Sequence, residues 1–180
     1  MRTLLPLLLA ALLLAHSASA AQGSAPDPAD TVRTTADRVL EVVEEERGRY
    51  EEDPEPMRSR LDEILAPRLA FAQIAEKVMA EFRPRFDPEQ TERFRSAFRR
   101  SLVELYSDAL VALKAQEVSV EDARMQGERR ATVRMNVRNS DGERFVIHYA
   151  LGLEETDWVV RNLLVDGINL GVTFRNQFAS

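Results

Sequence analysis

The spacing of apolar residues along the chain changes once, near Glu117. Before this point apolar side chains recur every three or four positions, which is typical of amphipathic helices. After it they alternate with polar side chains, which is typical of half-buried strands. Helices followed by strands predict a single α+β domain, in which N-terminal helices pack on a C-terminal curved antiparallel four-stranded sheet.

The predicted helices have recognisable starts and ends. Asp27-Pro28 and Asp87-Pro88 each provide an N-cap followed by proline at the first helical position. The prolines in residues 53–56 separate the first helix from the second, and Pro67 ends the second. The fourth helix is the clearest, with one apolar stripe made of Phe94, Ala97, Phe98, Leu102, Leu105, Tyr106, Ala109, Leu110 and Leu113.

The predicted strands follow one another closely. Residues 118–120 form a weak strand, and residues 131–138 alternate strictly between apolar and polar. Residues 139–142 read as a hairpin turn, after which residues 145–151 alternate again and a last strand begins at Trp158. An antiparallel meander is the simplest topology for this order.

The first twenty residues read as a secretory signal peptide. A short positive start precedes a run of about a dozen apolar residues, which is too short to span a bilayer. Ala18-Ser19-Ala20 then supplies small residues for cleavage. We therefore predict a signal peptide over residues 1–20, a flexible leader over 21–29 and the folded domain over 30–180.

Composition excludes several partners. The chain has 24 basic and 30 acidic residues, so its net charge of −6 disfavours nucleic acid. The same charge disfavours permanent attachment to anionic membranes, and no later apolar run is long enough for stable membrane insertion.

The sequence offers little catalytic chemistry. After signal removal His148 is the one histidine, and the chain has no cysteine. Neither a nucleophile with its base nor a metal-ligand set is visible, so no catalytic or metal-ligating residue is predicted. A pair of carboxylates from different elements would be invisible at this level and stays open.

The end of the chain carries a more specific signal. Residues 158–170 read WVVRNLLVDGINL, and residues 174–178 read FRNQF. Together with FAQIA at residues 71–75 and DPEQ at residues 87–90, they resemble the MlaC family of periplasmic phospholipid-binding and toluene-tolerance proteins. Asn162 and Asn169 depart from the usual family pattern and fit a divergent branch, including the hopanoid-associated relatives.

The resemblance implies a nuclear-transport-factor-like or cystatin-like fold with a deep apolar pocket. It implies a soluble, monomeric periplasmic carrier that takes phospholipid between an outer-membrane lipoprotein–porin complex and an inner-membrane ATP-driven lipid transporter, and so maintains outer-membrane lipid asymmetry. It implies no cofactor besides the lipid cargo and no enzyme activity. A hopanoid or another apolar lipid is the alternative cargo.

Under this interpretation, acyl chains contact apolar side chains from the helices, the sheet and the C-terminal segment. The same residues would equally fill an ordinary core, because periodicity does not distinguish a filled interior from a hollow one. The expected lipid-binding residues are Phe71, Ile74, Val78, Phe98, Leu102, Leu105, Tyr106, Val133, Met135, Phe145, Ile147, Tyr149, Trp158, Val160, Phe174 and Phe178.

Two other functions remain open from the sequence. One is a small enzyme on a nuclear-transport-factor-like scaffold, with an Asp or Tyr as base in the cavity. The other is a lipid-free periplasmic adaptor that has a solid core and acts through its charged faces. Candidate docking faces are the acidic segment 41–53 and the basic group Arg93, Arg95, Arg99 and Arg100, although a solvated helix face explains the latter equally well.

Overall fold

The computed structural model describes residues 25–79 and 85–179, with side chains up to residue 176. The predicted signal peptide lies outside the described residues. The helices are α1 (Pro28–Glu46), the 3-10 turn η1 (Arg47–Arg49), α2 (Glu55–Leu65), α3 (Phe71–Met79), α4 (Pro88–Leu113) and α5 (Leu170–Ala179). The strands are β1 (Ala115–Val120), β2 (Arg124–Met125), β3 (Arg130–Asn139), β4 (Arg144–Glu154), β5 (Asp157–Val165) and β6 (Ile168–Asn169).

The predicted helix starts are confirmed. The Asp27 carboxylate accepts a hydrogen bond from the backbone N–H of Ala29 at 2.7 Å, and Pro28 is the first residue of α1. Asp87 caps α4 with Gln90 in a reciprocal capping box, because each side chain bonds the other residue's backbone N–H. These caps satisfy N–H groups that have no partner inside the helix.

The sheet confirms the predicted fold class. Its strands run in the order β1-β3-β4-β5-β6, β2 also pairs with β3, and each of these strand pairs is antiparallel. The four long strands are the four that the alternation predicts, and β2 and β6 add two residues each.

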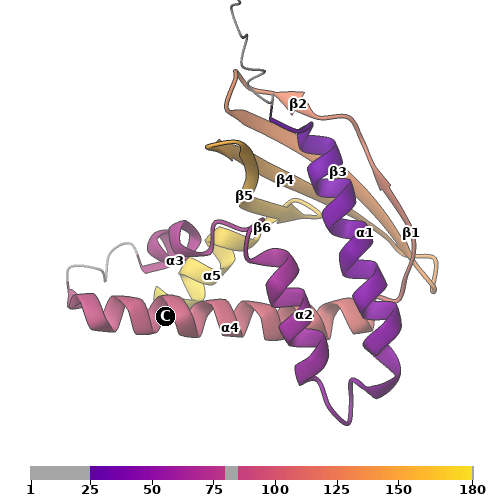
Figure 1. Cartoon of the computed structure of the whole chain (residues 1–180), viewed down its shortest axis with the longest axis horizontal. Coiled ribbons are helices and arrows are strands. Elements are labelled where there is room, and N and C mark those ends of the chain that lie inside the picture. The colour runs from indigo at the N-terminus through magenta and orange to yellow at the C-terminus, as the bar shows by residue number, and fades with distance from the viewer. Residues whose placement is uncertain (1–24, 80–84, 180) are drawn as a thin grey trace, which may run out of the picture.

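The helices divide between one face and one end of the sheet (Figure 1). The helix α1 lies across a face of the sheet and contacts β1 and β3. The long α4 packs against α2 and α3, while α3 and α5 lie against β5. The covered face carries the apolar residues of β3, which are buried at every second position.

A β-bulge at Arg161 changes which residues of β5 face the helices. Leu151 of β4 pairs with Val160, but the preceding residue of β4, Ala150, pairs with Asn162. The extra residue shifts the alternation by one. Trp158 and Val160 therefore face inward before the bulge, and Leu163 and Val165 do so after it.

The outer edge of β5 is covered by the segment that follows α2. The backbone N–H of Val160 donates to the carbonyl oxygen of Arg68 at 2.8 Å, and the N–H of Ala70 donates to the carbonyl oxygen of Val160 at 3.0 Å. Leu69 thus forms a short parallel bridge with Val160. This pairing fixes the end of α2 and the start of α3 beside the sheet.

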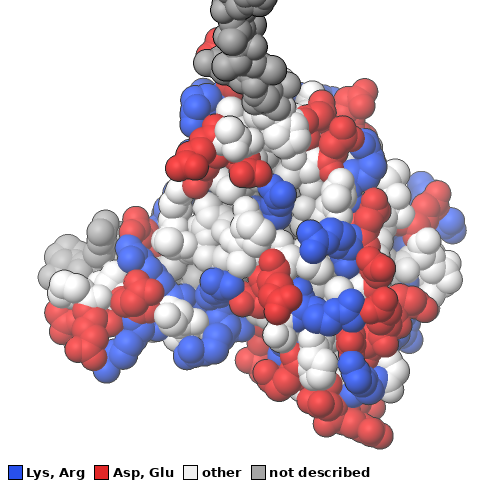
Figure 2. Space-filling model, viewed as in Figure 1, with Lys and Arg blue, Asp and Glu red and all other residues white. Residues whose placement is uncertain are grey.

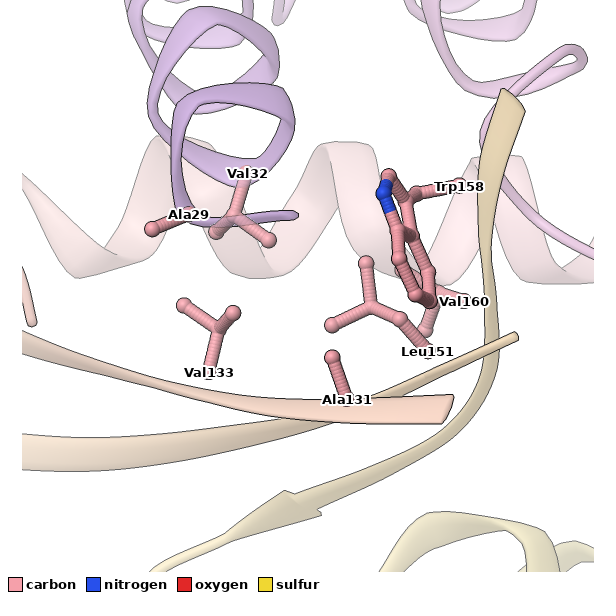
Figure 3. Close-up of a cluster of buried hydrophobic side chains, with 7 residues drawn as sticks. All are labelled: Ala29, Val32, Ala131, Val133, Leu151, Trp158 and Val160. Carbon is pink, nitrogen blue, oxygen red and sulfur yellow. The ribbon is translucent and has the colours of Figure 1, made fainter. Parts of the chain in front are cut away.

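The buried apolar side chains form three separate clusters. The first joins the start of α1 to the sheet and contains Trp158 (Figure 3). The second joins α1 to α2 around Met57 and Leu61, and the third joins α3 to α4 around Phe71 and Phe98. A domain of this size ordinarily has one contiguous core, so the division indicates space between the clusters.

Candidate functional site

The space between the three clusters is a cavity of about 590 Å³. Its walls come from α1, the end of α2, the second half of α4 and the inward face of β1, β3, β4 and β5. Most of the lining is aliphatic or aromatic. This volume and composition are typical of a site for an apolar small molecule.

A second cavity of about 410 Å³ adjoins the first. It lies between α3, α4, α5 and β5, and its lining includes Ile74, Leu102 and Phe174. The two cavities share four residues, which are Leu69, Tyr106, Val160 and Leu163. A ligand longer than one cavity can therefore extend past this shared wall, from the mostly apolar large cavity into the smaller one, whose lining also includes Lys77, Arg161 and Arg175.

Two tyrosines contribute phenols to the walls of the large cavity. Tyr106 comes from α4 and Tyr149 from β4, and each side chain is half-buried. Burial raises the pKa of Tyr106 to about 12. Burial, and secondarily the nearby Tyr106 phenol, raises the pKa of Tyr149 well above its ordinary value. Both phenols therefore stay protonated at neutral pH and are available as hydrogen-bond donors.

The large cavity brings together seven of the predicted site residues. They come from three different strands and from α4, and the inward alternation of β3, β4 and β5 aligns them. They are Tyr106, Met135, Phe145, Ile147, Tyr149, Trp158 and Val160. Ile74, Leu102 and Phe174 line the smaller cavity instead.

The remaining predicted residues line neither cavity. Phe71, Val78 and Phe98 are packed in the third cluster, where they hold α3 against α4. Val133 is fully buried in the first cluster between the sheet and α1. Leu105 is 51% exposed on the outer side of α4, so the prediction that it contacts the ligand is wrong. Phe178 lies outside the residues whose side chains the structure describes.

The wall residues that sequence reasoning missed include two informative groups. Leu163 and Val165 line the cavity because of the bulge at Arg161, and the polar pair Arg161-Asn162 inside an apolar strand was the available signal. The inner face of α1 was recognised as helical but not as cavity wall. Its lining residues are Thr31, Val32, Thr35, Ala36, Val39 and Leu40.

The predicted basic group on α4 is largely engaged within the protein. Arg99 makes a two-pronged ion pair with Asp62 of α2, at 2.7 and 2.6 Å. Arg95 pairs with Glu76 and Glu92, and a weaker contact joins Arg93 to Glu89. These contacts support the solvated, ion-paired face over a free docking patch.

Most carboxylates of the acidic segment are exposed, whereas Glu46 is buried and pairs with Arg49 and Arg60. Figure 2 shows acidic side chains gathered at the C-terminal end of α1 and the turn to α2, where Glu51, Glu52 and Asp53 lie at the surface.

Neither a metal site nor a membrane-spanning helix is found in the described ranges, residues 25–79 and 85–179. Within them, no group of three or more His, Asp or Glu side chains is placed to hold a metal ion. None of the helices in these ranges combines the length and apolar character that a bilayer span requires.

The fold and the cavities define a small α+β binding protein with an apolar interior. Comparison with known proteins gives its family. The chain belongs to the MlaC family, because the model of that family, described as MlaC protein, matches residues 33–180. The resemblance inferred from the sequence is thereby confirmed.

Two relatives agree with this assignment. The toluene tolerance protein ttg2D of Pseudomonas putida is 33% identical over 157 residues, which cover 87% of this chain and 73% of that protein. The intermembrane phospholipid transport system binding protein MlaC of Haemophilus influenzae is 21% identical over 172 residues, which cover 93% and 78% of the two chains. The second name describes a binding protein of a transport system, in agreement with the prediction that the chain is not an enzyme.

A solved structure supports the fold independently. The phospholipid-binding protein from Ralstonia solanacearum, determined in complex with a phospholipid, superposes with a TM-score of 0.75 at 26% identity. The match covers 86% of each chain.

Proposed function

We propose that this protein binds a phospholipid in its apolar cavities and carries it between membranes as the binding protein of an intermembrane transport system. The observation that carries the proposal is the cavity of about 590 Å³ that lies between three hydrophobic clusters. The phospholipid bound to the Ralstonia solanacearum protein and the printed function of the Haemophilus influenzae relative support it.

The physical task is to shield acyl chains from water. Each buried methylene is worth about 0.8 kcal/mol, so two chains with about 30 methylenes carry a hydration cost on the order of 20 kcal/mol. A free lipid therefore leaves a bilayer very slowly. A cavity lined with aliphatic side chains matches the apolar environment of the bilayer. The free energy of moving a lipid between bilayer and cavity is therefore close to zero, and the transfer needs no chemical step.

The proposed location and partners are supported by the sequence and the family. The signal-like residues 1–20 direct the chain across the inner membrane, and we infer that it acts in the periplasm. We further propose that it exchanges lipid with an inner-membrane ATP-driven transporter and with an outer-membrane lipoprotein–porin complex. The exposed acidic turn between α1 and α2 is available for a basic surface on either partner.

Native mass spectrometry of the protein purified from cells tests the proposal. We expect a stoichiometric adduct with the mass of a phospholipid, released when the protein is denatured. An adduct with the mass of a hopanoid would reassign the cargo. A bare polypeptide that also takes up no phospholipid from added vesicles would contradict the carrier function.

A further inference from the structure

Most polar side chains that line the large cavity are already satisfied by the protein. The hydroxyl groups of Thr31 and Thr35 donate to backbone carbonyl oxygens of α1 and its cap, and the indole N–H of Trp158 donates to the carbonyl oxygen of Pro26. The amide of Asn139 donates to Glu143 at 2.8 Å, and Arg68 pairs with Asp157 at 3.1 Å. These groups have no reason to face a ligand.

The two cavity tyrosines are the exception. The Tyr149 hydroxyl has the thioether sulfur of Met135 as its one partner among the described residues, at 3.8 Å, and sulfur is a weak acceptor. The Tyr106 hydroxyl has no hydrogen-bond partner among the described side chains and backbone. Both side chains are half-buried in the cavity wall, and neither hydroxyl has a strong acceptor from the protein, so each is available to an acceptor that arrives with the ligand.

The two phenols lie in the same part of the cavity. Tyr106 belongs to the wall that the two cavities share, and Tyr149 is paired across the strands with Leu163, which belongs to the same wall. The electrostatic effect of Tyr106 on Tyr149 also places the two side chains near each other. They therefore present two donors at the junction of the cavities, with the mostly apolar wall of the large cavity on one side and the mixed wall of the smaller cavity, which includes Lys77, Arg161 and Arg175, on the other.

We propose that Tyr106 and Tyr149 donate hydrogen bonds to the ester carbonyl oxygens of a diacyl glycerolipid and so select ester-linked cargo. Ester carbonyls are acceptors only, and they lie where the apolar chains meet the polar part of the lipid. That arrangement matches two donors set where the apolar wall of the large cavity meets the more polar wall of the smaller one. The inference rests on the proposed function and names the lipid linkage that the cavity recognises.

A competition between two lipids tests this directly. The full mature protein is stripped of lipid and offered equal amounts of diester and diether phosphatidylethanolamine with the same chain lengths, and the bound lipids are counted by native mass spectrometry. A net hydrogen bond between neutral groups changes an equilibrium constant by roughly 3- to 10-fold. We therefore expect roughly 10-fold or greater preference for the diester lipid.

Phenylalanine variants test whether the two tyrosines produce the preference for the diester lipid. The double variant Tyr106→Phe, Tyr149→Phe keeps the apolar ring surface, so we expect it to bind as much lipid in total but to lose the diester preference. Each single variant should lose part of it. The third tyrosine of the chain, Tyr50, is the matched control. It packs in the second cluster, donates a hydrogen bond to Asp108 and lines neither cavity, so Tyr50→Phe should keep the preference.

The outcomes separate the two proposals. Equal uptake of both lipids by the unaltered protein overturns the role of the tyrosines and leaves the carrier function standing, and this measurement needs no variant to fold. A preference that survives in the double phenylalanine variant also overturns it. Failure of the unaltered protein to bind either lipid contradicts the proposed function itself.

Discussion

The indole nitrogen of Trp158 donates a hydrogen bond to the carbonyl oxygen of Pro26, 2.8 Å away. The bond ties the residue before the N-cap of α1 to the start of β5. The indole ring packs with Ala29 and Val32 of α1 and is 3% exposed, yet part of it borders the large cavity (Figure 3). Trp158 thus holds α1 against the sheet and also lines the cavity.

Because Trp158 is the one tryptophan of the chain, its fluorescence reports on the cavity without ambiguity. We expect a phospholipid with brominated acyl chains to quench most of this fluorescence, since bromine quenches at contact distance. The unbrominated lipid is the control and should leave the intensity unquenched. Equal intensities with the two lipids would mean that acyl chains do not reach this wall.

Filling the cavity should expel lipid without unfolding the protein. Ala109 and Ala97 are both exposed on α4, but Ala109 borders the large cavity and Ala97 lines neither cavity. We expect Ala109→Trp to lower the retained lipid at least about 10-fold, because a large side chain occupies the space. The free energy of unfolding should change by no more than about 2 kcal/mol.

The matched control for that experiment is Ala97→Trp. It adds the same side chain to the same helix and should retain lipid at the level of the unaltered protein. Native mass spectrometry and urea denaturation measure the two properties. Equal retention by both variants would contradict the location of the site.

Alkaline pH should destabilise the protein through Tyr106. Burial raises the pKa of Tyr106 in the folded state to about 12, whereas the phenol in the unfolded chain titrates near 10. The stabilising contribution is complete below pH 10 and is lost as pH rises toward about 12, because the unfolded chain releases its proton first. The loss amounts to at most about 3 kcal/mol.

Urea denaturation at a series of pH values measures this effect. The variant Tyr106→Phe has no phenol at this position, so its free energy of unfolding should fall less steeply above pH 10. Parallel curves for the two proteins would show that Tyr106 is not protected from ionisation by folding.

The ion pair between Arg99 and Asp62 should stabilise the contact of α4 with α2. The guanidinium bonds both carboxylate oxygens and lies 5.4 Å from the ring centre of Phe71. Lysine has no planar fork and cannot reproduce this geometry. We expect Arg99→Lys to lower the free energy of unfolding by about 1 kcal/mol, with less effect at high salt.

The neighbouring Arg100 provides the control. It is exposed and makes no ion pair with the described residues, so Arg100→Lys should leave the free energy of unfolding unchanged. Thermal or urea denaturation at low and high salt gives both values. A loss of equal size in the two variants would assign the effect to the change of side chain and not to the pair.

The elements of the fold could be predicted because local chemistry determines them. Asp27-Pro28 and Asp87-Pro88 start helices through caps that involve only adjacent residues. The strict alternation of β3 reflects one buried and one open face, so it appears directly in the sequence. The order of helices and strands then leaves few arrangements.

The cavity could not be predicted in the same way, because a wall residue and a core residue obey the same hydrophobic pattern. Phe98 and Tyr106 lie on one stripe of α4, but Phe98 packs in a cluster and Tyr106 borders both cavities. The difference depends on what lies opposite each side chain. The bulge at Arg161 is a second reason why the cavity wall could not be predicted. A single inserted residue turns Leu163 and Val165 to the other face of the sheet.

The segment that pairs with Val160 protects one edge of the sheet from pairing with another chain. An exposed strand edge is a template for pairing with other chains. Here residues 68–70 and β6 cover the edge of β5, and the opposite edge, β1, carries a register irregularity and the charged Glu117. Addition of a strand from another molecule, and with it polymerisation through the sheet, is therefore discouraged at both edges.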